Sequence, residues 1–224
     1  MMESQFPESL LSRIENCGVI SVLIIEELQQ AVPIAKALLA GGVDAMELTL
    51  RTPVALDALR AIRSEVPEML AGIGTILRPQ QIHEVIEAGA AFGVAPGMNP
   101  TVVREAQQAD LPFAPGIATP SDIEIALSYG CKELKFFPAE PSGGLPYLKS
   151  MAAPYQHLGV RFVPLGGVNA ENFGIYLRDP SILAVGGSWL APAAAISEKR
   201  WDIITDVAKA ATAQAGSVRQ GTNC

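Results

Sequence analysis

The stretch CKELKFFPAE, residues 131–140, places a lysine inside an apolar run. Neighbouring side chains of a strand point to opposite faces. Leu134 and Phe136 therefore share one face, which suits packing against helices. Lys135 shares the other face with Glu133, although lysine is almost never fully buried without a partner. The stretch predicts a strand that has helices on one side and an enclosed interior with a charged side chain on the other.

Similar strand-like runs alternate with amphipathic helical patterns along the whole chain. Such a series predicts parallel strands with helical crossovers, and eight strand–helix units are the number that closes a TIM barrel. An open doubly wound sheet is the alternative, but it gives no reason for the even spacing. We predict one α/β domain over residues 1–224, a TIM (β/α)8 barrel at about 17–205 with an extra N-terminal helix at 6–17. The predicted strands are Val19–Ile25, Asp44–Leu50, Leu70–Ile76, Phe92–Ala95, Pro112–Gly116, Glu133–Phe137, Arg161–Leu165 and Ile182–Val185.

Composition argues against several classes of protein. The net charge is −7 without a long basic run, which disfavours a nucleic-acid-binding surface. No apolar run approaches the ~20 residues that cross a bilayer, and the N-terminus lacks the pattern of a signal peptide. Cys17, Cys131 and Cys224 have no paired spacing, and the two histidines have no acidic partner at metal-ligand spacing. We predict a cytoplasmic protein that binds no membrane, nucleic acid, metal or cofactor.

The second predicted strand carries a candidate functional pair. Functional side chains of a TIM barrel lie at the carboxyl ends of its strands. Met46 and Leu48 occupy the apolar face of this strand, so Glu47 is predicted to point into the barrel, with Arg51 at the mouth. A structural Glu–Arg pair at a strand end is the alternative interpretation.

Other strand ends add candidates for substrate binding. The third strand ends in GIGTI, where small glycines leave room beside Thr75, and the fourth ends in VAPG, with Pro96 at the rim. Loops after the last two strands are a recurring phosphate site of these barrels, although a single Gly-Gly pair is usually just a tight turn. The two glycine pairs here predict a phosphate site formed by Gly166, Gly167, Gly186, Gly187 and Ser188.

Lys135 has three possible explanations. It extends to solvent, forms a structural pair with Glu47, or performs chemistry. Extension to solvent suits a mid-barrel position poorly, and a purely structural buried pair often adds little stability. Desolvation and a neighbouring cation such as Arg51 favour the neutral amine, the form that attacks a carbonyl group to make a Schiff base. We predict a Schiff-base lysine, with Glu47 as the carboxylate that moves protons.

These motifs resemble a known family. MELTLRTPVALDALRAI, GIGTIL, APG, KFFPAE, GGV and VGGSWL are similar to segments of the 2-keto-3-deoxy-6-phosphogluconate (KDPG) aldolases, also called 4-hydroxy-2-oxoglutarate (KHG) aldolases. The resemblance runs from about residue 10 to residue 205. It implies a homotrimeric class I aldolase of TIM-barrel fold without a metal or cofactor. Such an enzyme cleaves KDPG to pyruvate and glyceraldehyde 3-phosphate, and KHG to pyruvate and glyoxylate.

The resemblance also implies roles for individual residues. Lys135 would form the Schiff base and Glu47 would act as general acid and base. Arg51 and Thr75 would hold the carboxylate side of the keto acid. Pro96 and Phe137 would shape the pocket, and the phosphate would be bound by Gly166, Gly167, Gly186, Gly187 and Ser188. The chain departs from the family at Leu165, where the seventh strand commonly ends in Thr-Gly-Gly, and this puts the preference for the aldehyde side in question.

Other functions use the same barrel. An isomerase or synthase that acts on a sugar phosphate would keep the phosphate site, and a pyruvate aldolase with another aldehyde would keep the lysine. A third possibility is a barrel that binds a ligand and has lost its activity. Lys135 favours an aldolase over an isomerase, because isomerisation does not need a buried amine on that strand. The presence of Lys135, Glu47 and Arg51 together disfavours a barrel that has lost its activity.

Overall fold

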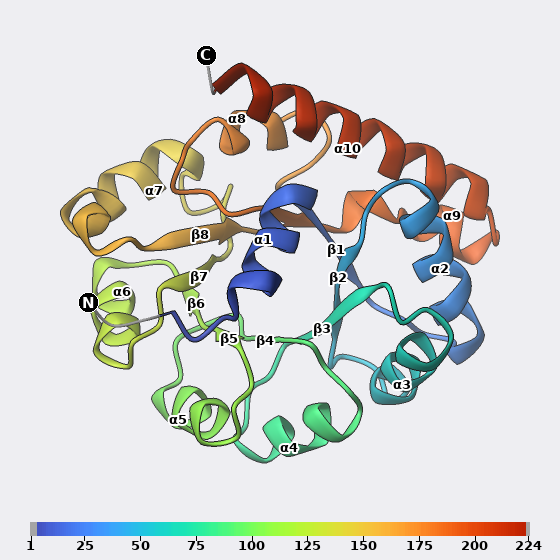
Figure 1. The fold of residues 1–224 in the computed structure, drawn as a ribbon, viewed down its shortest axis with the longest axis horizontal. Helices are drawn as coiled ribbons and strands as arrows, with labels where there is room; N and C mark the ends of the chain where they lie inside the picture. Colours follow the sequence, from blue (N-terminus) through green and yellow to red (C-terminus); the bar gives the residue numbers. More distant parts are fainter. Residues whose placement is uncertain (1–3, 223–224) are drawn as a thin grey trace.

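The strands of this protein run parallel inside a ring of helices (Figure 1). The computed structural model describes residues 4–222. In chain order the elements are α1 (Glu8–Cys17), β1 (Val19–Leu23), α2 (Leu28–Ala40), β2 (Ala45–Thr49), α3 (Ala55–Glu65), β3 (Leu70–Gly74), α4 (Gln80–Glu87), β4 (Gly93–Val94), α5 (Pro100–Gln108), β5 (Phe113–Ala114), β6 (Gly116–Ile117), α6 (Pro120–Ser128), β7 (Glu133–Phe136), α7 (Gly144–Ala152), η1 (Ala153–Leu158), β8 (Arg161–Pro164), α8 (Phe173–Leu177), β9 (Val185–Gly187), η2 (Ser188–Leu190), α9 (Ala193–Ser197) and α10 (Trp201–Thr222).

The strands form a closed ring. Their hydrogen-bonded orders are β5-β4-β3-β2-β1-β9 and β6-β7-β8, and every pair is parallel. On one side, Phe162 of β8 pairs with Ile182, which lies just before β9. On the other side, Pro115 alone separates β5 from β6. The predicted TIM barrel is confirmed, and α1 is its predicted extra helix.

Two predicted strands differ from the observed ones by more than their end residues. The predicted fifth strand, Pro112–Gly116, is divided at Pro115 into β5 and β6, because proline has no N–H group to donate to a sheet. The predicted eighth strand, Ile182–Val185, begins later and runs over Val185–Gly187. The second glycine pair therefore forms the end of β9, whereas the predicted bounds placed it just after the strand.

The longest helix, α10, lies mostly beyond the predicted barrel and packs along α2 (Figure 1). The two helices approach closely at Gly41, where a Cβ atom would lie 2.3 Å from Cβ of Ala208 and 2.7 Å from the backbone oxygen of Thr205. The hydroxyl groups of Thr205 and Thr212 donate hydrogen bonds of 3.0 Å to carbonyl oxygens at the end of α2. Only glycine fits this crossing without displacing α10.

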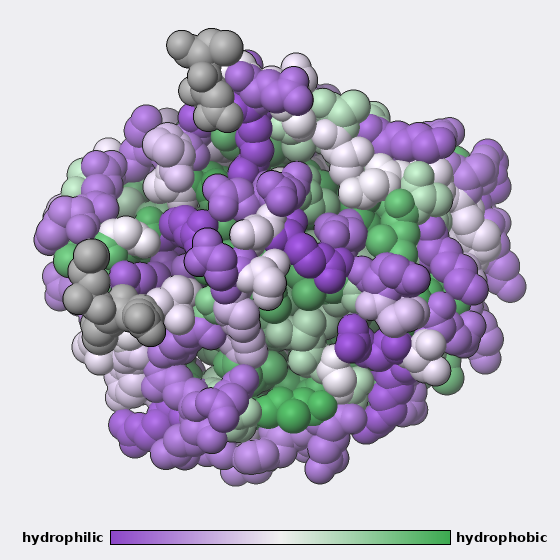
Figure 2. All heavy atoms as spheres, in the orientation of Figure 1, coloured by the Kyte–Doolittle hydropathy of each residue, from purple (hydrophilic) through white to green (hydrophobic). Residues whose placement is uncertain are grey.

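Helix α1 covers the amino-terminal end of the barrel, in front of the strands in Figure 1. Its side chains Leu10, Leu11 and Ile14, together with Phe6, pack on residues at the start of the strands, such as Leu70. Figure 2 shows this face, where hydrophilic residues dominate the rim and hydrophobic ones remain visible in the hollow beside α1, on the side of α4. This end of the barrel is therefore closed by the N-terminal segment.

Two further findings concern the described residues. Cys17 and Cys131 are buried free thiols, and Cys224 lies outside the described residues. Burial, and secondly the nearby carboxylate of Glu133, raise the pKa of the Cys131 thiol to about 12, so the protonated thiol is its stable form at neutral pH. Within residues 4–222, none of the helices has both the length and the apolar character of a membrane span.

The contact between α2 and α10 leads to a stability prediction. Gly41→Ala forces a methyl group against α10, so we expect the free energy of unfolding to fall by about 1–3 kcal/mol. Gly216→Ala is the matched control, because a Cβ atom at Gly216 meets nothing within 4 Å. This second change should stabilise the helix by about 0.5–1 kcal/mol. Urea unfolding of both variants measures the two effects, and equal effects would contradict the close approach.

Candidate active site

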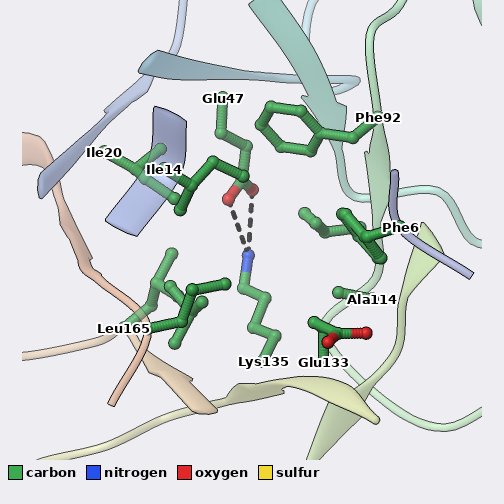
Figure 3. A pocket seen from close by; sticks show the side chains of 12 residues that line it. Phe6, Ile14, Ile20, Glu47, Phe92, Ala114, Glu133, Lys135 and Leu165 are labelled. Atoms are coloured by element: carbon green, nitrogen blue, oxygen red, sulfur yellow. Dashed lines mark hydrogen bonds and ion pairs between the residues drawn. The ribbon is translucent and has the colours of Figure 1, made fainter. Parts of the chain in front are cut away.

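Lys135 and Glu47 form an ion pair inside the barrel. Lys135 Nζ donates a hydrogen bond of 2.9 Å to Oε1 of Glu47 and one of 3.1 Å to Oε2. The lysine comes from β7 and the glutamate from β2, and they are only 6% and 3% exposed. Figure 3 shows the two side chains pointing toward one another, with apolar side chains around them. Both residues therefore point into the barrel, as their strand alternation predicts.

Glycines on the neighbouring strand β3 make room for this pair. A Cβ atom at Gly74 would lie 1.8 Å from Oε1 of Glu47, so any other residue would displace the carboxylate. Gly72 lies beside the ring of Phe92, and a Cβ atom there would be 2.3 Å from it. Phe92 packs at the base of the barrel close to the ion pair (Figure 3). The glycines of GIGTI thus make room for Glu47 and Phe92, whereas the sequence suggested room beside Thr75.

The Lys135 ammonium group lies between a carboxylate and an aromatic ring. From the sequence, burial and a nearby Arg51 were expected to favour the neutral amine. Lys135 is buried, but its ammonium group bonds to the Glu47 carboxylate and lies 5.6 Å from the centre of the Phe137 ring. An anion and an aromatic face both stabilise a cation. The 2.9 Å hydrogen bond joins the two side chains that the sequence predicts as the Schiff-base lysine and the proton-moving carboxylate.

A cavity of about 560 Å³ opens above the ion pair, at the carboxyl ends of the strands. The structure brings every predicted site residue to its wall: Glu47, Arg51, Thr75, Pro96, Lys135, Phe137, Gly166, Gly167, Gly186, Gly187 and Ser188. Their positions along the strands differ. Lys135 and Glu47 are buried, whereas Arg51 and Ser188 are exposed. The buried pair therefore lies deep in the cavity, and the exposed residues lie toward its mouth.

Backbone conformation distinguishes three of these residues. Thr75 has a φ of 62°, which is uncommon for a β-branched residue. Strained positions of this kind cluster at functional sites, where the surrounding structure holds them in place. Gly166 and Gly167 have φ values of 92° and 83°, so the turn after β8 depends on glycine.

Leu165 lies between the ion pair and the glycine turn. It is 5% exposed, it lines the cavity, and its Cδ2 atom would lie 2.7 Å from a Cβ atom at Gly186. A glycine at position 186 thus accommodates the leucine side chain. The departure from the expected threonine therefore changes the wall of the cavity and is not confined to the packing of the helices.

The apolar part of this wall was not predicted from the sequence. Val22 and Ile24 lie at the end of the first strand and just after it, Trp189 follows the last, and Ile196 belongs to α9. Apolar residues at strand ends are indistinguishable from core residues in one sequence, so no signal could have separated them.

The hydroxyl group of Thr49, which also lines the cavity, donates a hydrogen bond of 3.2 Å to the carbonyl oxygen of Leu23.

Glu140, the last residue of KFFPAE, braces the glycine turn. Its backbone N–H donates a hydrogen bond of 2.9 Å to the carbonyl oxygen of Gly166, and its side chain accepts a hydrogen bond from the hydroxyl group of Tyr176 in α8. Burial, and secondly this hydrogen bond, raise the pKa of Tyr176 well above its usual value. A Cβ atom at Gly167 would lie 2.6 Å from Cβ of Glu140. The segment after β7 and the segment after β8 are thereby held together.

Comparisons with known proteins agree with this geometry. The family described as KDPG and KHG aldolase matches residues 10–207. The chain belongs to this family. It is 47% identical to the KHG/KDPG aldolase of Escherichia coli K12 over 193 residues, which are 86% of this chain and 90% of the relative. It is 45% identical to the 2-dehydro-3-deoxy-phosphogluconate aldolase of Dickeya dadantii, over 88% of this chain and 92% of the relative.

Solved structures of KDPG aldolases have the same fold. The Legionella pneumophila enzyme, with pyruvate captured as a covalent carbinolamine intermediate, matches with a TM-score of 0.86 and 39% identity, covering 90% of this chain and 97% of that one. The Zymomonas mobilis enzyme with 3-phosphoglycerate matches with a TM-score of 0.83 and 42% identity, over 90% of this chain and 94% of that one. Within residues 4–222, no group of three or more histidine, cysteine, aspartate or glutamate side chains is arranged to hold a metal ion.

The buried ion pair leads to a second stability prediction. Lys135→Met leaves the Glu47 carboxylate buried without its cation, so we expect the free energy of unfolding to fall by about 3–5 kcal/mol. The double variant Lys135→Met/Glu47→Leu removes both charges, and most of the lost stability should return, because an apolar pair avoids the desolvation cost. Urea unfolding at pH 7 checks both. A double variant as unstable as the single one would show that packing, and not the unpaired charge, limits stability.

Proposed function

We propose that this protein is a class I aldolase that cleaves KDPG to pyruvate and glyceraldehyde 3-phosphate, and KHG to pyruvate and glyoxylate. The observation that carries the proposal is the buried Lys135–Glu47 pair deep in a cavity of about 560 Å³. A lysine in this position needs a chemical reason, and formation of a Schiff base supplies one. The family supports the same reaction, because relatives that align over 90% and 92% of their own length carry these names.

Lys135 begins the reaction by losing a proton to Glu47. The free amine attacks the keto carbon of the substrate and forms a carbinolamine. Glu47 then returns a proton to the carbinolamine hydroxyl group, which leaves as water, and the C=N bond of the iminium forms. The 2.9 Å contact allows one carboxylate to serve every proton transfer at this nitrogen.

Cleavage uses the iminium as an electron sink. Glu47 takes the proton of the C4 hydroxyl group, the C3–C4 bond breaks, and the aldehyde product leaves. The electron pair of that bond forms the enamine of pyruvate, and the nitrogen becomes neutral. Glu47 then protonates C3 of the enamine, and hydrolysis of the iminium releases pyruvate and restores the ion pair.

The remaining site residues orient the substrate. Arg51 and Thr75 lie on the wall near Glu47 and are assigned to the carboxylate of the keto acid. Pro96 and Phe137 shape the pocket, and the phosphate is assigned to the two glycine pairs and Ser188. Support for this end comes from the positive φ values of Gly166 and Gly167 and from the 3-phosphoglycerate of the Zymomonas mobilis structure. We further propose that the enzyme is a cytoplasmic homotrimer, as the family resemblance implies.

Trapping of the imine tests the function. We expect sodium borohydride with pyruvate to attach one reduced pyruvyl group, which peptide mass spectrometry locates on Lys135. Lys135→Arg is the control and should remain unlabelled. Glu47→Gln should be labelled about 10²–10⁴ times more slowly, the usual weight of a positioned acid or base. A label on Lys132 or Lys149, or no label on the natural protein, would exclude this function.

Leu165 leads to a prediction about specificity. A leucine cannot bond to a substrate hydroxyl group, and a hydroxyl group buried without a partner costs about 1–3 kcal/mol. We expect the enzyme to discriminate weakly between KDPG and its C4 epimer, or to use a bound water instead. Leu165→Thr should raise the preference for KDPG by up to roughly tenfold, equivalent to about 1.4 kcal/mol. The measurement is the ratio of kcat/KM for the two epimers in both proteins. An unchanged ratio would mean that this side chain does not contact the substrate.

A further inference from the structure

A second, smaller cavity of about 30 Å³ lies beneath the ion pair, at the end of the barrel covered by α1. Its lining is mainly apolar, and Phe6 and Ile14 from the N-terminal segment close its base (Figure 3). The charged side chains among its lining residues are Glu47, Lys135 and Glu133. The proposed mechanism uses the first two and leaves the third without a role.

Glu133 is a buried carboxylate on the same strand as the reacting lysine, β7, nearer to the end of the barrel that α1 covers. It lies two residues before Lys135 on the same face of β7, which places the two backbone positions about 6.6 Å apart. It is only 4% exposed, and a buried carboxylate is costly to keep unless it is paired and bonded. Both side chains line the smaller cavity, where apolar walls screen a charge much less than water does.

Arg161 is the cation that pairs with Glu133, and it balances the negative charge of Glu133 only in part. Arg161 of β8 approaches Oε1 of Glu133 at 3.4 Å, its side chain is 28% exposed, and it also pairs with Glu15 of α1 at 3.3 Å. Ser4 donates a hydrogen bond of 2.7 Å to the other oxygen of Glu133. The arginine charge is thus shared between two carboxylates and lies nearer to solvent, whereas the Glu133 charge lies inside the barrel.

Few charged groups act on the lysine nitrogen. Glu47 from β2 touches it, Glu133 from β7 lies below it, and Arg161 from β8 lies beyond Glu133. Arg51 lies toward the mouth on the wall of the open cavity. The other residues that line the two cavities carry no charge. Glu133 is therefore the second anion of this interior.

We propose that Glu133 is a positioning residue for the Schiff-base step, and that its fixed negative charge below Lys135 stabilises the cationic forms of the reacting nitrogen. This inference rests on the proposed function. In the balanced step, the lysine ammonium group and the ketone give the iminium and one water, while Glu47 relays the proton between nitrogen and oxygen. During the attack Glu47 holds the transferred proton and is neutral, so it cannot balance the positive charge that develops on nitrogen. Glu133 takes no part in this proton transfer.

A purely structural role is the alternative. Glu133 also ties the N-terminal segment to the barrel through Ser4, so its loss could act only by loosening this end. Two variants imitate that loss and leave the Glu133 charge in place. Ser4→Ala removes the tie itself, and Glu15→Gln removes the outer partner of Arg161. Neither residue lines either of the two cavities.

The experiment compares Glu133→Gln with these two controls by borohydride trapping of pyruvate on Lys135. At subsaturating pyruvate and neutral pH, we expect Glu133→Gln to trap roughly three- to tenfold less adduct, the size expected for the loss of one partly compensated charge. The loss of an anion also lets the amine form more easily. On the acidic side of the pH profile (the acidic limb), the trapping rate should therefore begin to fall at a lower pH. Ser4→Ala should keep the natural yield and pH profile, even where thermal unfolding shows it to be less stable. Glu15→Gln leaves Arg161 to Glu133 alone, so it should give a smaller change in the same direction as Glu133→Gln.

Other outcomes are equally informative. A yield and pH profile of Glu133→Gln that match those of Ser4→Ala would overturn the inference and leave a structural role. If Glu133→Gln does not fold, Arg161→Gln takes its place. This variant uncovers the Glu133 charge, so its acidic limb should move to higher pH, and an unmoved limb overturns the inference. Failure of the natural protein to trap pyruvate would overturn the proposed function as well, which separates the two failures.

Discussion

The site depends on one interaction, the ion pair of Lys135 and Glu47 in the interior of the barrel. Removing two charges from water costs several kcal/mol for each ion, and good geometry is needed to recover that cost. The fold supplies this geometry by placing β2 and β7 opposite one another and by leaving β3 without a side chain at Gly74, where the carboxylate lies. In the proposed mechanism, the same pair that satisfies the buried charges also supplies the acid, the base and the nucleophile.

Strand alternation made much of this predictable. In residues 133–137 the apolar and charged side chains alternate so regularly that the inward direction of Lys135 follows from the sequence alone. The same pattern in the second strand indicates the direction of Glu47. These predictions succeeded because alternation is a local property of an extended backbone. The number and spacing of the repeats then indicated a closed barrel.

Properties that depend on distant contacts could not be predicted in this way. The sequence does not show that the ring of Trp189 occupies the space where Gly187 would carry a side chain, with 1.9 Å between that ring and a Cβ atom. It does not show that Tyr176 binds Glu140 across two segments. Nor does it indicate that Thr75 adopts a positive φ. Each of these features joins residues from separate elements or fixes a conformation that local propensity disfavours.

Leu165 lines both the larger cavity and the smaller one, as do Lys135 and Glu47. Together these three side chains form a floor between the larger cavity and the apolar compartment below. The proposed mechanism needs both charged members, so position 165 is the part of the floor that can vary. A shorter side chain at position 165 would leave a gap between the two cavities, through which water could pass along the barrel axis. The size of this side chain therefore sets how far solvent penetrates under the substrate, in addition to what the substrate meets above it.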